Sequence, residues 1–142
     1  ASDVYKRQTV AMAGTFGYEL DPAKLSEEEK QQIQEQIAEF KKYYDVIHFG
    51  NYYRLTNAME EGPYAAWEFA KEDGSEALVS VVASRVRTND PGVRIKLRGL
   101  KENQIYLVNG EEYPGGALMH GGLLIEEAKK EYQSWNYHIV MK

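Results

Sequence analysis

The feature that most constrains the fold is a strongly marked helix start in the first third of the chain. Ser26 and Glu29 have capping-box spacing, in which the serine oxygen accepts a backbone N–H three residues on and the glutamate accepts the N–H of the cap. Behind this start, apolar side chains recur at steps of four, three, four and three residues, at Ile33, Ile37, Phe40, Tyr44 and Ile47. This period predicts one long amphipathic helix.

The apolar stripe of this helix needs a partner, because leaving large side chains exposed costs roughly 1.5–3 kcal/mol each in lost burial. We expect the stripe to pack on the rest of the chain or on a second copy. The other expectation is that the segment before Ser26 is poorly ordered.

From Gly50 onward the hydrophobic pattern changes to a period of two. The runs rich in Val, Ile, Tyr and Trp are Tyr52–Thr56, Tyr64–Lys71, Glu76–Val86, Val93–Arg98, Gln104–Val108 and Gln133–Met141. Between them lie turn signals: "EEGP" at 60–63, "EDGS" at 72–75, "NDPG" at 89–92, "NG" at 109–110 and "PGG" at 114–116. Short strands with a turn about every ten residues predict a mainly β fold, an antiparallel sandwich or barrel.

Composition excludes several classes of function. The chain has 142 residues, 43% of them hydrophobic and 27% charged, and a net charge of −5. This acidic balance argues against nucleic acid and anionic membranes as partners, because no basic stripe is present to collect phosphates. There is no cysteine, so disulfides, thiolate catalysis and Cys-ligated zinc are excluded. No apolar run reaches the ~18–20 residues that a membrane-spanning helix needs.

No motif for catalysis, metal binding or cofactor binding is identified. His48, His120 and His138 are far apart in the sequence and lack the spacing of metal ligands, so we interpret them as surface or packing residues. The serines lie in no nucleophile elbow, and no glycine-rich loop precedes a helix as phosphate binding requires. We therefore predict no catalytic, no cofactor-binding and no metal-binding residue, and no cofactor.

Aromatic side chains offer one alternative to a purely structural interpretation. The candidates for stacking on a sugar ring are Tyr52, Tyr53, Tyr132 and Trp135. Burial in the sandwich core is the more common use of aromatic residues. Trp67 and Phe69 share one strand face, and we expect both to be buried in the sandwich. In the last strand the residues expected on one face are Gln133, Trp135, Tyr137, Ile139 and Met141.

Several longer stretches together resemble a known family. "VAMAGTFGYELDPAKLSEEEKQQIQEQIAEFKKYYDVIHFGNYYRL", from Val10 to Leu55, is similar to the end of the catalytic barrel and the start of the C-terminal domain of glycoside hydrolase family 36 α-galactosidases. Further matches, in the family's order, are "AAWEF" at 65–69, "SEALV" at 75–79, "IKLRGL" at 95–100, "IYLVNG" at 105–110 and "GGALMHGGL" at 115–123. Each is weak alone, but their order and spacing are specific.

The resemblance implies an antiparallel β-sandwich of Greek-key type, preceded by one long amphipathic helix left from the end of a (β/α)8 barrel. Family catalysis is a retaining double displacement by two aspartates, both on barrel segments upstream of Thr9. No Asp of this chain lies in either motif, so no catalytic position is carried over. The implied partner is the barrel of the parent enzyme, self-association is left open, and the implied location is cytoplasmic.

The resemblance also sets the expected boundaries. Residues 9–47 are expected to form the terminal strand or loop and the last helix of the barrel, with Thr9–Gly14 ("TVAMAG") as a short buried strand. Residues 48–142 are expected to form the sandwich. Residues 1–8 ("ASDVYKRQ") do not continue the family pattern and look like translated adapter sequence, so we interpret them as a non-native leader. The link before the last strand is more charged than is usual in the family, which leaves that strand's register open.

Three functional hypotheses follow. The first is a non-catalytic C-terminal domain of an α-galactosidase that hydrolyses terminal α-galactosyl residues of oligosaccharides, with a packing role and, as a further option, oligomer contacts. The second is a carbohydrate-binding module that uses exposed aromatic residues. The third, a protein-interaction domain unrelated to glycosidases, rests only on how general sandwich folds are. The sugar specificity of the parent enzyme cannot be predicted from this chain.

Overall fold

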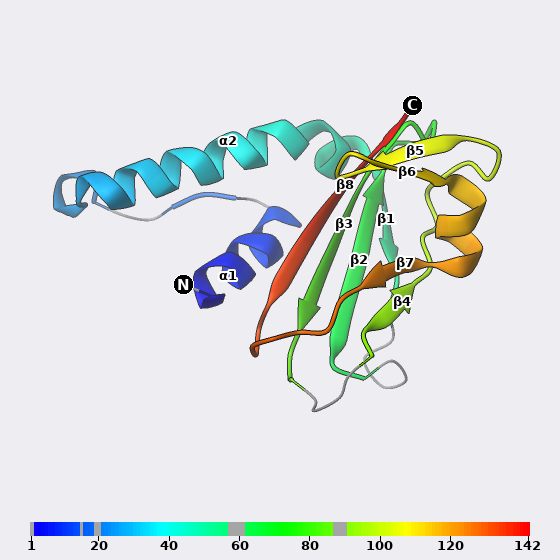
Figure 1. Ribbon diagram of the computed structural model, residues 1–142. Helices are drawn as coiled ribbons and strands as arrows, with labels where there is room; N and C mark the ends of the chain where they lie inside the picture. The colour runs from blue at the N-terminus through cyan, green and yellow to red at the C-terminus, as the bar shows by residue number, and fades with distance from the viewer. Residues whose placement is uncertain (1, 15, 19–20, 57–61, 87–90) are drawn as a thin grey trace.

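The computed structural model describes residues 2–14, 16–18, 21–56, 62–86 and 91–142. Its elements, in chain order, are α1 (Ser2–Met12), a 3₁₀ turn (Pro22–Lys24), α2 (Glu27–Phe49), β1 (Asn51–Arg54), β2 (Tyr64–Ala70), β3 (Glu76–Ala83), β4 (Val93–Ile95), β5 (Ile105–Val108), β6 (Glu111–Pro114), a π-helical turn (Ala117–Gly121), β7 (Leu123–Ile125) and β8 (Ser134–Met141). Figure 1 shows a β-rich body from which α2 extends.

The long helix α2 begins with the predicted capping box. The backbone N–H of Glu29 donates to Ser26 Oγ at 3.2 Å, and the backbone N–H of Ser26 donates to Glu29 Oε2 at 2.8 Å. The Ser26 hydroxyl also donates to Glu29 Oε2, at 3.0 Å, and the two bonds that this carboxylate accepts, from the Ser26 N–H and the hydroxyl, hold the pKa of Glu29 below its ordinary value. The helix ends at Phe49, and the N–H of Gly50 donates to the carbonyl of Val46 at 3.1 Å. The predicted helix is confirmed and continues to Phe49.

The body is a six-stranded antiparallel sheet in the order β1-β2-β3-β8-β5-β6, with a separate antiparallel pair, β4-β7. The last strand returns to the middle of the sheet, where it pairs with β3 on one side and β5 on the other. Its register sets Trp135 opposite Val81 and Ile139 opposite Ala77. The predicted mainly antiparallel fold with one long helix is confirmed.

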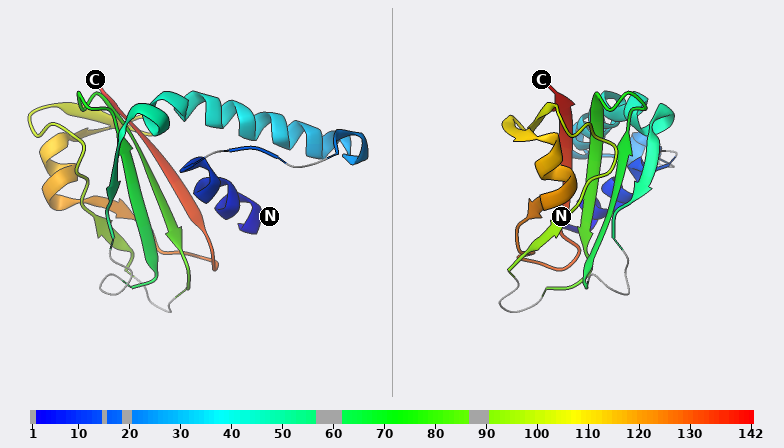
Figure 2. Two further views of the ribbon diagram at one scale, coloured as in Figure 1. Left: turned by 180° about the vertical axis from the view of Figure 1, so that it is seen from behind. Right: turned by 90° about the vertical axis from the view of Figure 1, so that its right-hand side faces the viewer.

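The larger hydrophobic core lies between the six-stranded sheet and the layer formed by β4, β7 and the π-helical turn (Figure 2). Alternate residues of β2 and β3 supply it, among them Ala66, Val79 and Val81. Ile95 and Leu123 from the smaller layer and Leu118 from the π-helical turn complete it. The predicted shared face of β8 is confirmed from Trp135 to Met141, and of these residues Ile139 is fully buried.

A second, smaller core lies on the opposite face of the six-stranded sheet, against α2 and α1. It contains Met12, Tyr43, Val46, Ile47, Phe69 and Leu78. The expectation that Trp67 and Phe69 lie inside the sandwich is therefore wrong. They share a face as predicted, but that face meets the helices, so Phe69 is buried there and Trp67 is half-buried.

The expected strand at Thr9–Gly14 is also wrong, since residues up to Met12 are helical. Ala11 and Met12 are strong helix formers, and a helix places Thr9 and Met12 close together on the side that meets the sheet. Both are buried, and Asn136 Nδ2 on β8 donates to Thr9 Oγ1 at 3.4 Å. Helix α1 crosses the expected boundary at residue 8 without a break, and the assignment of residues 1–8 to a leader stays a prediction.

The predicted strands lie at the expected positions, but several are shorter in the structure than predicted. β3 ends at Ala83 and β4 at Ile95. Two short strands, β6 and β7, were missed, and "PGG" at 114–116 leads into the missed π-helical turn. Parts of the predicted turns at 60–63 and 89–92 lie outside the described residues.

Candidate functional site

Each of the three histidines contacts a different partner within the chain. His48 stacks on Tyr44 with ring centres 4.0 Å apart, and His120 Nε2 lies 2.8 Å from Glu102 Oε1 at the surface. His138 Nε2 lies 2.8 Å from Glu76 Oε1. Across the described part of the chain, no group of three or more His, Cys, Asp or Glu side chains is placed to hold a metal ion. Within the same residues, no helix is long and apolar enough to span a membrane.

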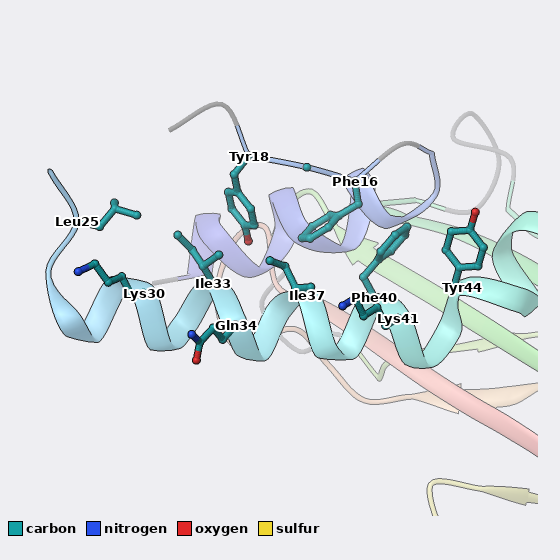
Figure 3. A pocket seen from close by; sticks show the side chains of 11 residues that line it. Phe16, Tyr18, Leu25, Lys30, Ile33, Gln34, Ile37, Phe40, Lys41 and Tyr44 are labelled. Carbon is teal, nitrogen blue, oxygen red and sulfur yellow. The ribbon is translucent and has the colours of Figure 1, made fainter. Parts of the chain in front are cut away.

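The main candidate site is a groove along the first two thirds of α2, which we call the α2 groove. It encloses about 630 Å³ between α2 and the segment that precedes the helix (Figure 3). Its described lining residues are Phe16, Gly17, Tyr18, Leu25, Lys30, Ile33, Gln34, Ile37, Phe40, Lys41 and Tyr44. The predicted stripe of α2 is therefore brought together in one place, except for Ile47.

The two ends of α2 bury partly different faces. Tyr43, Val46 and Ile47 are buried against the sheet, whereas Ile33 and Ile37 line the groove. Because each residue turns a helix by about 100°, Ile47 continues the predicted stripe and Tyr43 and Val46 lie beside it, so the buried face shifts around the helix toward its C-terminal end. The expectation that the stripe packs on the rest of the chain holds at its C-terminal end. Nearer the N-terminal end of α2, Phe16 from the preceding segment covers part of the stripe. Its ring stacks on that of Phe40, with ring centres 5.0 Å apart.

The chemistry of the groove suits an apolar partner. Phe16, Ile33, Ile37 and Phe40 form its walls, and none of the described residues that line it is acidic. Lys30 and Lys41 lie among the lining residues, and Tyr18 is partly exposed there, with its pKa raised by burial. Such a surface offers hydrophobic burial, and its described residues supply no carboxylate for acid–base chemistry.

The aromatic candidates for sugar stacking separate into two groups. Tyr53 and Trp135 are half-buried and pack on the sandwich core, while Tyr52 and Tyr132 are exposed. The ring of Tyr52 lies 5.3 Å from that of Phe69. Phe49, at the end of α2, is 77% exposed and is the most exposed large apolar side chain of the described residues.

One buried carboxylate was missed at the sequence level. Glu68 on β2 is fully buried on the sandwich side, where its two oxygens accept the backbone N–H groups of Arg98 at 2.8 Å and Gly99 at 3.0 Å. Burial raises the pKa of Glu68, and the two backbone bonds and the Arg98 charge offset part of that rise. The signal that could have found it is a lone acidic residue at a core-facing position of "AAWEFA". These hydrogen bonds hold the loop at 97–100 against β2.

A second electrostatic cluster lies where α2 meets the sheet. Glu76 accepts from Lys71 Nζ at 2.6 Å and contacts His138 Nε2 at 2.8 Å, and the His138 ring lies 5.1 Å from that of Tyr43. Burial alone would raise the pKa of Glu76, but the bonds with Lys71 and His138 outweigh it and hold the pKa below its ordinary value. This cluster links β3 to β8 beneath the helix.

A smaller cleft of about 340 Å³ lies beside the π-helical turn, between that turn, β6 and the β4-β7 pair. Arg94 and Tyr113 are the polar side chains among its described lining residues. Both have contacts within the chain, since Arg94 Nη1 donates to the carbonyl of Gly122 at 3.3 Å and Tyr113 Oη donates to Glu111 Oε2 at 2.9 Å. The cleft therefore holds no group aimed at a ligand.

Together the fold and the groove define a β-sandwich domain attached to a long helix with an unfilled apolar face. Comparison with known families then makes the assignment specific. Residues 64–139 match the model described as the glycosyl hydrolase family 36 C-terminal domain, and residues 1–50 match the melibiase model. The chain belongs to glycoside hydrolase family 36, and most of it corresponds to the C-terminal domain of that family. The resemblance seen in the sequence is confirmed.

Related proteins are α-galactosidases. The chain is 45% identical over 135 residues to the bifunctional α-galactosidase/sucrose kinase AgaSK of Mediterraneibacter gnavus, covering 94% of this chain and 14% of the relative. It is 39% identical over 134 residues to the α-galactosidase AgaA of Geobacillus stearothermophilus, covering 94% of this chain and 18% of the relative. The chain therefore spans less than a fifth of the length of these relatives.

Solved structures agree with this assignment. The galactosidase domain of AgaSK matches with a TM-score of 0.86 and 44% identity, over 96% of this chain and 19% of that one. The family 36 α-galactosidase AgaB from Geobacillus stearothermophilus matches with a TM-score of 0.87 and 39% identity, over the same shares. The chain therefore spans about a fifth of the length of each of these structures.

Proposed function

We propose that this chain is the non-catalytic C-terminal part of an α-galactosidase that hydrolyses terminal α-galactosyl residues of oligosaccharides. Its role is to pack against the catalytic barrel through α2 and so to hold the end of the barrel in place. A cytoplasmic location, implied by the family resemblance, belongs to the same proposal.

The α2 groove is the observation that supports this role. The groove encloses about 630 Å³, and its walls are the partly exposed apolar side chains of Phe16, Ile33, Ile37 and Phe40, which a packed neighbour would bury. The melibiase model, which matches residues 1–50, covers the whole of α2, so the groove lies in the part of the chain that belongs with the melibiase domain. An apolar surface of the barrel is the partner that fits.

The absence of a catalytic role is tested directly. The purified chain should release no chromophore from a chromogenic α-galactoside, even at high protein concentration. The control is the galactosidase domain of AgaSK under the same conditions. Turnover that copurifies with the folded chain through successive columns would contradict the proposal.

The packing role is tested in a chimera, in which residues 9–142 of this chain replace the corresponding segment of the AgaSK galactosidase domain. Ile37→Asp introduces a charge into the groove, while Ala38→Asp, one residue on, introduces the same charge at an exposed position of the same helix. We expect Ile37→Asp to lower the melting temperature and the activity of the chimera and Ala38→Asp to leave both near those of the parent.

Melting the same two variants of the isolated chain distinguishes lost contact with the barrel from lost stability of the chain itself. Ile37 is half-buried there, so both variants should melt close to the unchanged chain. Equal stability of the two variants in the chimera would show that the groove does not face the barrel.

Sugar binding is the alternative that a titration decides. Tyr52 and Tyr132 are the exposed members of the predicted aromatic set. A change in intrinsic fluorescence on adding raffinose-type sugars, lost in Tyr52→Ala or Tyr132→Ala, would favour a carbohydrate-binding module over a packing role. We expect no change.

A further inference from the structure

The turn between β5 and β6 contains an asparagine followed by glycine, the one such pair in the sequence. Val108 pairs with Glu111, so Asn109 and Gly110 form a two-residue hairpin loop. Both have positive φ, 50° at Asn109 and 96° at Gly110, as a type I′ turn requires. From these observations we propose that Asn109 is a site of spontaneous deamidation, which yields aspartate and isoaspartate.

The surroundings of Gly110 leave the attacking nitrogen accessible. Gly110 has no side chain, it is exposed, and apart from its two neighbours in the chain none of the described residues has an atom within 4 Å of where a Cβ would lie. Any other residue at this position would shield the backbone nitrogen and would be strained at a φ of 96°. Water can therefore reach both the nitrogen and the side-chain amide of Asn109.

The side-chain amide of Asn109 is polarised by a backbone donor. The N–H of His138 on β8 donates to Asn109 Oδ1 at 3.2 Å, and the N–H of Asn109 donates to the carbonyl of His138 at 3.3 Å. A hydrogen bond to this oxygen makes Cγ more electrophilic and stabilises the negative charge that develops when a nucleophile adds. The same pair of bonds ties the turn to the sheet.

The reaction needs water as its only co-reactant. The backbone nitrogen of Gly110 attacks Asn109 Cγ and gives up its proton, and the Cγ–Nδ2 bond breaks as ammonia leaves, which closes a five-membered cyclic imide. Water then adds to one of the two imide carbonyl carbons and breaks that carbon's bond to nitrogen. Opening at Cγ gives aspartate, and opening at the main-chain carbonyl gives isoaspartate. The net change is amide plus water to carboxylic acid plus ammonia.

The two products differ in structural effect. Aspartate keeps an oxygen that accepts from the His138 N–H, so the hairpin stays paired. Isoaspartate adds a methylene group to the main chain of a two-residue loop and alters the register that Val108 and Glu111 set. Both products add a negative charge beside Glu111 and Glu112 on the edge strand β6.

The test is to incubate the folded chain at mildly alkaline pH and follow the peptides around each asparagine by mass spectrometry. An isoaspartyl methyltransferase reports the isoaspartate product. Asn103, which is exposed and followed by Gln104, and Asn136, which is half-buried and followed by Tyr137, serve as controls within the same molecule. We expect the mass increase and methyltransferase labelling at Asn109, with both control asparagines unchanged. Both signals should be lost in Asn109→Gln, whose side chain is one carbon longer and would have to close a six-membered ring.

Two results would overturn the proposal. The first is an unchanged Asn109 in the folded chain while the chain in denaturant converts at this position, because the folded turn would then protect the amide. The second is equal conversion at Asn103 and Asn109, because the site would then have no special reactivity. Circular dichroism before and after incubation establishes that the chain stayed folded.

Discussion

The side chain of Glu68 is fully buried in the sheet. It accepts hydrogen bonds from the backbone of the loop at 97–100. Its oxygens accept the N–H groups of Arg98 and Gly99, and a hydrogen bond to a charged group contributes roughly 1.5–3 kcal/mol. Glu68→Ala should therefore lower the free energy of unfolding by about 3 kcal/mol or more. Urea denaturation measures it, and a midpoint equal to that of the unchanged chain would contradict the assigned role.

Glu68→Gln separates the charge of this side chain from its hydrogen bonds. Because the folded-state pKa of Glu68 is raised, the folded chain binds this proton more tightly than the unfolded chain does. Its contribution to stability is full below the ordinary pKa of glutamate and declines as pH rises through the raised value. Glu68→Gln should lose less stability than Glu68→Ala, and its unfolding midpoint should depend less on pH between the ordinary pKa and neutrality.

Glu76 should show the opposite pH dependence. Its folded-state pKa is lowered, so its contribution is present above the ordinary pKa and is lost as pH falls through the lowered value. Glu76→Gln removes the charge that pairs with Lys71 and contacts His138, and it should cost about 1–2 kcal/mol at neutral pH and nothing at the acid end. Melting temperatures measured across the acid range test this. A variant that stays equally destabilised at low pH would exclude the charge as the cause.

At the scale of elements, α2 is held to the sheet by its last two turns. Val46 is 1% exposed in the smaller core, and removing two methyl groups there should cost about 2 kcal/mol in Val46→Ala. Glu28→Ala, in the exposed first turn, should change stability by no more than about 0.5 kcal/mol. Thermal melts of the two variants compare them, and similar melts would mean that the helix does not depend on this contact.

The elements that the sequence predicts well are those with local signals. The capping box of Ser26 and Glu29 and the stripe behind it define α2 without any tertiary information. The strands β6 and β7 have only four and three residues, and β6 ends in Pro114, so neither shows an alternating pattern. The run that ends at Met12 contains both β-branched and helix-forming residues, and its helical state depends on contact with β8.

The sequence predicts that Trp67 and Phe69 share a face of β2, but it does not predict which layer covers that face. A period of two assigns Trp67 and Phe69 to one face of β2 and Ala66 and Glu68 to the other, but it does not say which layer covers each face. The sheet is covered on both sides, by the β4-β7 layer and by the helices, so apolar residues occur on both. The same limit applies to the α2 groove, because the stripe of α2 was predictable and its partial cover by Phe16 was not.

At the scale of the whole molecule, the first half of α2 should open separately from the sheet. β3 lies between β2 and β8 in the larger body, so its amides are paired on both sides. The first half of α2 extends away from the sheet (Figures 1 and 2) and is covered there by the segment that contains Phe16 and Tyr18. Few buried contacts and a solvated helix face allow local opening at a lower free energy than global unfolding.

Native-state hydrogen exchange should therefore rank these segments. We expect amides of residues 30–41 to exchange through local opening, at a free energy well below that of the β3 amides, which should exchange through global unfolding. In the chimera with the AgaSK galactosidase domain, a barrel packed into the α2 groove would raise the protection of residues 30–41 toward that of β3 and leave β3 little changed. Equal protection of both segments in the isolated chain would show that α2 and the sheet unfold as one unit, and that the groove needs no partner to hold the helix.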